Sequence, residues 1–210
     1  NWIDTSAITD MYDLFRRNKK FNGHIELWDV SNVTNMTYMF SDTAFNRDIS
    51  EWDVSNVTTM SFMFSNSDFN GDLSKWDVSN VTTMDRMFSH SKFTGENGDI
   101  TGWDVSNVED MSFMFTYTKF NQPIGKWNIH NVRDISGMFG QTNYFNQDIS
   151  GWDIRNITGM ATLFYCAKSF NKDLSKWDVS HVEDMSYMFY SAESFNQDIS
   201  KWKINKACKT

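Results

Sequence analysis

Aspartate residues recur at fixed positions along this chain and are its most prominent candidates for chemistry. One column directly follows the recurring tryptophan, with asparagine at one position: Asp29, Asp53, Asp77, Asp104, Asn128, Asp153 and Asp178. A second column precedes the tryptophan by four residues: Asp48, Asp72, Asp99, Asp148, Asp173 and Asp198. Carboxylates in such patterns have two common uses, the binding of hard cations and the capping of turns.

Two interpretations of the aspartate columns follow from this. In the first, each carboxylate accepts a hydrogen bond from the backbone amide two residues on, as from Asp53 to Ser55, and the columns are structural. In the second, Ca²⁺ lies between adjacent units and takes oxygen ligands at ~2.3–2.6 Å. Because the glycine-rich signature of calcium-binding repeats is absent, we predict no cofactor and keep calcium as the less favoured alternative.

No other group of residues has the spacing of a catalytic or metal site. No serine has a matched histidine and acid, and no cysteine and histidine set has zinc-ligand spacing. The histidines occupy unrelated positions in the repeat: His24, His90, His130 and His181. Cys166 and Cys208 also lie at non-equivalent positions, which favours two free thiols. The sequence therefore predicts a protein that is not an enzyme.

The candidate residues belong to a repeat that fills the chain. Tryptophan recurs at positions 28, 52, 76, 103, 127, 152, 177 and 202, and similar sequence motifs surround each copy. Units of this length cannot bury an apolar face alone and must stack. We therefore expect one domain over residues 1–210, with a half repeat at 1–20 and a partial repeat at 195–210. The segment Gly95 to Asp99 is an insertion, which predicts a bulging loop.

The apolar spacing within one copy predicts two elements. Ile49, Trp52 and Val54 match the strand part of a leucine-rich repeat, and from Val57 to Phe64 the spacing becomes helical. Serine and glutamate three residues apart, as in Ser106 and Glu109, resemble helix capping boxes. The predicted fold is α/β, a leucine-rich-repeat-like solenoid of about eight strand-turn-helix units of 24–27 residues, with a parallel sheet on the concave side.

Three further sets of repeated residues are interpreted as scaffold. The tryptophan, methionine and phenylalanine stripes should form the core, and the asparagines after the loop phenylalanines should link one return loop to the next. Another slot holds aromatic residues in four copies: Tyr38, Phe62, Phe113 and Tyr187. Lateral packing between neighbouring units explains these rings, although a docking strip is the alternative.

Composition limits the partners. A net charge of −8 and a pI near 4.9 disfavour nucleic acids and anionic membrane surfaces, which both demand clustered Lys and Arg. No run of about 18 apolar residues is present, so we expect no direct membrane insertion by this segment. Because the first residue is Asn1 and the first unit is a fragment, we expect a piece of a longer protein that carries the targeting signals.

The candidate binding face comprises the aspartate column after the tryptophans and the neighbouring slots that change between copies. The variable slots hold Glu26, Glu51, Lys75, Lys126, Arg155 and Lys176. Residues that vary at surface positions, while the core positions keep the same residue types, are typical of a recognition surface. We expect a protein or glycan partner, on another cell or in the extracellular matrix.

The central motif WDVSNVTxMSxMF, preceded by FNxDIS, resembles the repeat of about 25 residues found in BspA-like leucine-rich-repeat bacterial surface proteins and lipoproteins. The resemblance covers Ile3 to about Ile204. It implies an extracellular or cell-surface location, within a secreted or anchored protein, and a role in adhesion. Pro123, Asn128 and Ile135 depart from the pattern in one copy.

Two other functions compete with adhesion. The array is also suited to a structural spacer that carries another domain away from a cell surface. A column of serine and threonine, which includes Ser50, Ser74 and Thr101, suggests an ice-binding or mineral-ordering surface. Charged neighbours and the absence of TxT pairs disfavour the latter.

Overall fold

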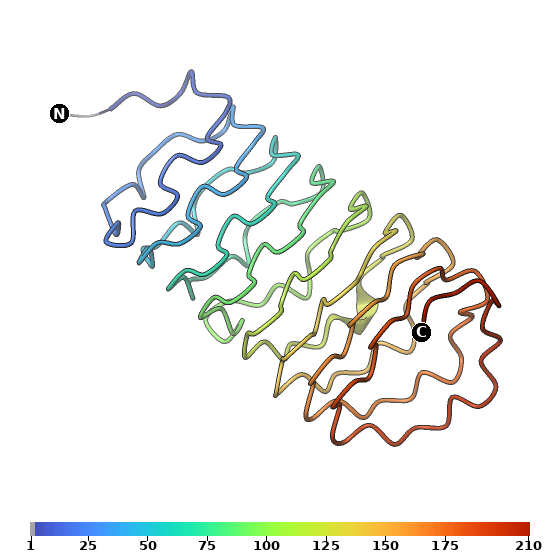
Figure 1. Cartoon of the computed structure of the whole chain (residues 1–210). Helices are drawn as coiled ribbons and strands as arrows, with labels where there is room; N and C mark the ends of the chain where they lie inside the picture. The colour runs from blue at the N-terminus through green and yellow to red at the C-terminus, as the bar shows by residue number, and fades with distance from the viewer. Residues whose placement is uncertain (1–2) are drawn as a thin grey trace.

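The chain forms a stack of similar coils. The computed structural model describes residues 3–210, and its coils follow one another from the N-terminus at one end of the stack to the C-terminus at the other (Figure 1). Eight parallel bridges join equivalent residues of successive coils, which are Asp10, Asn35, Thr59, Thr83, Asp110, Asp134, Gly159, Asp184 and Lys209. The prediction that equivalent positions line up in columns is confirmed.

The predicted secondary structure is wrong. Within residues 3–210 the only regular element is the three-residue 3-10 helix η1, Ile124–Lys126, and there is no strand beyond the isolated bridges. The described residues therefore do not form an α/β solenoid of leucine-rich-repeat type, and they contain no parallel sheet and no row of helices. The predicted capping boxes fail for the same reason, since the amide of Ser106 donates to Asp104 in a turn.

The segment predicted as a helix bonds to its neighbours along the stack. The amides of Met60, Phe62 and Phe64 donate to carbonyl oxygens of the following coil at 2.9–3.0 Å, whereas an α-helix would direct them to carbonyls four residues earlier in the same segment. Phe62 also has a φ of 57°, the left-handed region, which interrupts a right-handed helix. Apolar side chains at helical spacing are thus buried by a row of tight turns.

Alternate peptide groups in this segment point the same way along the stack. The carbonyl oxygen of Thr59 accepts from Met36 of the preceding coil, and the next amide, Met60, donates to Thr83 of the following coil. The intervening carbonyls bond within the coil, as when Met60 accepts from Met63 at 3.1 Å. Because only every second peptide joins neighbouring coils, the ladder is too sparse to form a parallel strand.

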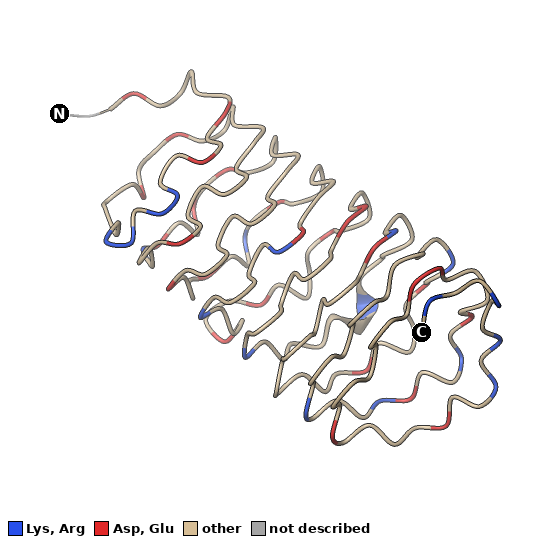
Figure 2. Cartoon of the chain, in the orientation of Figure 1, with Lys and Arg blue, Asp and Glu red and all other residues tan. Residues whose placement is uncertain are grey.

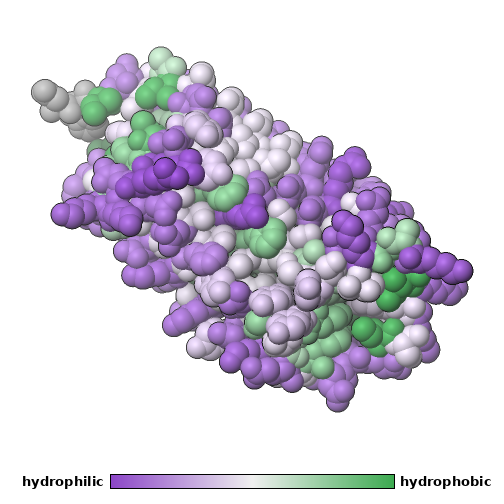
Figure 3. All heavy atoms as spheres, in the orientation of Figure 1, coloured by the Kyte–Doolittle hydropathy of each residue, from purple (hydrophilic) through white to green (hydrophobic). Residues whose placement is uncertain are grey.

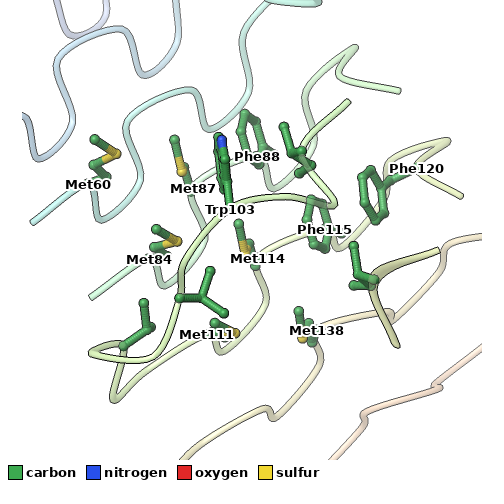
Figure 4. Packing of buried hydrophobic residues seen from close by; sticks show 14 of the residues in the cluster. Met60, Met84, Met87, Phe88, Trp103, Met111, Met114, Phe115, Phe120 and Met138 are labelled. Carbon is green, nitrogen blue, oxygen red and sulfur yellow. The ribbon is translucent and has the colours of Figure 1, made fainter. Parts of the chain in front are cut away.

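The core consists of ladders of stacked side chains, as expected. Phe88 is fully buried, lies 4.0 Å from Phe93 between ring centroids within its coil, and stacks on Phe64 and Phe115 of the adjacent coils at 5.8 Å. Methionine and tryptophan columns pack beside these rings, including Met111, Met114 and Trp103 (Figure 4). The core interpretation of the three stripes is confirmed for the central coils.

The asparagine column links the return loops, also as expected. The amide of Asn70 donates to Oδ1 of Asn46 at 2.8 Å, and the same contact recurs along most of the stack. The column is interrupted at Thr94, beside the inserted loop, where threonine replaces asparagine. No helix in residues 3–210 is long and apolar enough to cross a membrane. Cys166 and Cys208 are free thiols, as predicted.

Candidate functional site

The aspartate column after the tryptophans caps turns and is exposed, except for the half-buried Asp153. In each copy Oδ1 accepts the amide two residues on at 3.0–3.3 Å, in Asp29, Asp53, Asp77, Asp104, Asn128, Asp153 and Asp178. The hydrogen bond from the Ser79 hydroxyl, with that from its amide, holds the pKa of Asp77 below its usual value. The turn-capping interpretation is confirmed for this column.

The second aspartate column is built in the same way. Its carboxylates accept the amide two residues on at 2.8–2.9 Å, in Asp48, Asp72, Asp99, Asp148, Asp173 and Asp198. Throughout the described range, 3–210, no three or more His, Cys, Asp or Glu side chains converge as metal ligands would. Both columns therefore contribute to turn geometry and to the charge of the surface.

The variable slots before the tryptophans carry exposed charges of both signs (Figure 2). Lys75 forms an ion pair with Glu51 of the preceding coil, and His24 lies 2.8 Å from Glu26. Lys126, the last residue of η1, is exposed as well. Exposed pairs of this kind add little to stability, so these side chains remain available for contacts with a partner.

Four of the predicted face residues surround one hollow, which we call the charged hollow. Its volume is about 300 Å³, and Asp153, Arg155, Lys176 and Asp178 line it together with Ser150, Trp152, Ile154 and Trp177. Gly151 occupies the slot that holds lysine in the next coil, and a Cβ added there would meet almost nothing within 4 Å. The missing side chain leaves this part of the face open.

The polar groups of the charged hollow are partly organised. Asp153 accepts from Nε of Arg155 at 2.8 Å and lies 3.2 Å from Nδ1 of His130. The Arg155 hydrogen bond is the main reason that the pKa of Asp153 lies below its usual value. Two carboxylates and two cations therefore face solvent beside the buried Trp152 and Trp177. Such a site can bind hydroxyl, amide or charged groups, but it positions no nucleophile beside a base.

The remaining predicted residues lie in other coils. Glu26, Asp29, Glu51, Asp53, Lys75, Asp77, Asp104, Lys126 and Asn128 do not line the charged hollow. The inserted loop forms a larger polar hollow of about 520 Å³ beside Lys119 and Gln122, which the sequence prediction missed. The insertion itself was the only signal for it.

An apolar groove lies on the last full coil. A groove of about 430 Å³ is lined by Met185, Tyr187, Phe189 and Ile204 among other residues. The space-filling view shows hydrophobic atoms at this end of the stack and also near the N-terminal end (Figure 3). The polar side-chain groups among its lining residues are the Trp202 indole and the hydroxyls of Tyr187, Tyr190 and Thr210. None of them is charged, so we place the candidate binding site at the charged hollow.

Comparison with known proteins gives a family and no function. No curated protein and no solved structure matches the chain. A family model described as "Mycoplasma protein of unknown function, DUF285" matches residues 1–97 and 89–202. The expectation of a bacterial repeat family is thereby confirmed, whereas the BspA-like leucine-rich-repeat assignment is not. Because the two matches together cover nearly the whole chain, it belongs to the DUF285 family of Mycoplasma proteins of unknown function.

Proposed function

We propose that this chain is a non-enzymatic binding module of a secreted or cell-surface protein, which recognises a protein or glycan partner through the charged hollow and the adjoining variable slots. One observation carries the proposal. Residues that repeat in every coil are used by the scaffold, in the core or in turns, whereas the exposed slots beside them change in charge from coil to coil.

The charged hollow suits a partner that offers both donors and acceptors. Arg155 and Lys176 supply donors, and Asp153 and Asp178 supply acceptors. A sugar with neighbouring hydroxyls or a peptide with mixed charge has this complementarity. Extracellular location and adhesion remain part of the proposal and rest on the repeat family and on the earlier resemblance.

The test is a binding screen of the whole chain against arrays of glycans and matrix proteins. Two substitutions alter the hollow while restoring residues that other coils carry in the same slots, namely Arg155→Ser, as at Ser79, and Lys176→Gly, as at Gly151. Arg17→Asn is the matched control, because Arg17 is exposed in another column, whose equivalent in a later coil is Asn66. We expect the double variant to lose the binding that the control retains.

Two outcomes would count against the proposal. If no array member binds, or if the double variant binds as the native chain does, the charged hollow is not the recognition site. A structural spacer is the alternative, since the continuous stack holds its ends apart (Figure 1). For a spacer, removal of one whole coil would shorten the reach of a flanking domain and leave its binding unchanged.

A further inference from the structure

One surface column of the stack, which we call the ladder, carries an aromatic ring or a guanidinium in five of its eight positions. It occupies the slot three residues after each bridge, and its members share a positive φ of 52–62°: Asp13, Tyr38, Phe62, Arg86, Phe113, Gly137, Thr162 and Tyr187. Tyr38 stacks on Phe62 with 4.5 Å between ring centroids. Lateral packing between neighbouring coils therefore accounts for Tyr38 and Phe62, whereas Tyr187 is exposed and contacts Tyr190 of its own coil.

Arg86 occupies one position of this ladder, and its guanidinium lies between two aromatic rings. Its guanidinium carbon lies 5.1 Å from the centroid of Phe62 in the preceding coil and 4.4 Å from that of Phe113 in the following coil. A guanidinium between two aromatic faces is stabilised by cation–π attraction and by planar stacking. The chain thus contains its own example of an arginine held in this column.

The ladder is interrupted one coil after Phe113. Gly137 takes the ladder slot and Gly140 takes the slot of Ser89 and Thr116, so two neighbouring columns lose their side chains in the same coil. The result is a hollow of about 160 Å³, which we call the glycine hollow, with Phe113 on one side and Tyr165 of the next coil on the other. Gln141 and Thr162 complete its rim.

The ring of Phe113 leans over the first glycine. A Cβ atom at Gly137 would lie 2.3 Å from two of its ring carbons. Within residues 3–210 no aromatic ring stacks on Phe113, whose cation–π partner is Arg86. Like Arg86, the glycine hollow therefore lies between aromatic rings of the two flanking coils. Its second ring, Tyr165, comes from the neighbouring column, because Thr162 holds the ladder slot of that coil.

We propose that the glycine hollow binds the guanidinium group of an arginine on a partner protein. The aromatic rings of Phe113 and Tyr165 supply the walls, Arg86 shows that Phe113 accepts a guanidinium, and the net charge of −8 favours a cation over a neutral ring. Arginine suits the hollow better than lysine because its flat group stacks between rings. The site lies on a different column from the charged hollow and does not depend on the function proposed for that face.

The test titrates N-acetyl-arginine amide into the full ¹⁵N-labelled chain and follows the backbone amides of Gly137, Gly140 and Gln141 by NMR. Gly140→Tyr fills the hollow with a side chain that the same slot carries at Tyr165 and Tyr190. Tyr165→Ser removes one wall, and Ser65→Tyr is the matched control, since it places tyrosine in the same slot of a coil that does not line the hollow. N-acetyl-lysine amide and N-acetyl-tyrosine amide are titrated in parallel.

We expect saturable shifts at these amides with the arginine probe and about tenfold weaker binding in Gly140→Tyr and Tyr165→Ser, the change that loss of one strong cation–π contact produces. Ser65→Tyr should bind as the native chain does. The proposal is overturned if the arginine probe causes no local shifts, if Gly140→Tyr binds it equally well, or if the tyrosine probe binds more tightly than the arginine probe.

Discussion

Two tryptophans in adjacent coils provide a sharp test of the inter-coil packing. Trp152 and Trp177 have the same exposed fraction, 4%, and occupy the same column. Nε1 of Trp152 donates to the carbonyl oxygen of Ile124 at 3.1 Å. Nε1 of Trp177 is buried and finds no acceptor in residues 3–210. The two tryptophans therefore differ by one hydrogen bond, while the burial of their rings and their place in the coil are nearly the same.

Replacement of each tryptophan by phenylalanine separates this bond from the loss of ring area. Trp152→Phe forfeits a hydrogen bond with a net worth of about 0.5–1.5 kcal/mol, whereas Trp177→Phe removes a buried donor whose unsatisfied state already costs about 1–3 kcal/mol. The carbonyl of Ile124 keeps the amide of Trp127 as a donor, so no orphaned acceptor enlarges the first effect. Trp152→Phe should therefore destabilise by at least about 1 kcal/mol more than Trp177→Phe.

Differential scanning calorimetry on the two variants measures this difference. About 1 kcal/mol corresponds to a Tm that is about 2–4 °C lower for Trp152→Phe in a chain of this size. Trp127→Phe is the control, because its Nε1 bonds to Ile100 at 3.2 Å and it should behave as Trp152→Phe does. Equal Tm values for the two variants, or a lower Tm for Trp177→Phe, would refute the assignment of these hydrogen bonds.

Three further predictions follow from the ladders and turns. Phe88→Ala should lower the free energy of unfolding by about 3–5 kcal/mol, because it opens a cavity in both phenylalanine ladders, and denaturant unfolding measures the loss. Asn46→Ala should cost about 0.5–1.5 kcal/mol by the same assay, whereas Asn46→Asp, which keeps the acceptor for the amide of Asn70, should cost less. Because the folded-state pKa of Asp77 is lowered, the stability it contributes is present above its ordinary pKa of 3.8 and is lost as pH falls through the lower folded value. Thermal scans at pH 6 and pH 3 should show a smaller acid-induced fall in Tm for Ser79→Ala than for the native chain; an equal fall would contradict the role of the hydroxyl.

The sequence predicted the repeat, its columns and its core, because identical residues at equal spacing can only be buried by stacking. It did not predict the backbone between Val57 and Phe64. Apolar residues at that spacing fit a helix face and a row of turns equally well, and what decides between them is the partner of each amide. The positive φ of Phe62 and Arg86, residues that rarely adopt it, has no signature in residue type.

For the candidate site too, part of the structure could be predicted from the sequence and part could not. The turn-capping role of Asp53 followed from its spacing to Ser55, and the structure confirms it. The hollow that Arg155 and Lys176 share lies beside Gly151, a small residue in a slot that holds glutamate or lysine in most coils. The glycine hollow also arises from side chains that are missing at Gly137 and Gly140. For both hollows, the only sign in the sequence was a glycine at a position that carries a larger side chain in other coils.

The direction of the hydrogen bonds in the central coils is the most direct test of the stack. NMR measurement of scalar couplings across hydrogen bonds, on perdeuterated ¹³C,¹⁵N-labelled chain, identifies the acceptor of each amide. The account predicts couplings from the amides of Met84, Arg86 and Phe88 to the carbonyls of Asp110, Ser112 and Met114 in the following coil. A coupling from the amide of Phe88 to the carbonyl of Met84, the α-helical pattern, would contradict it.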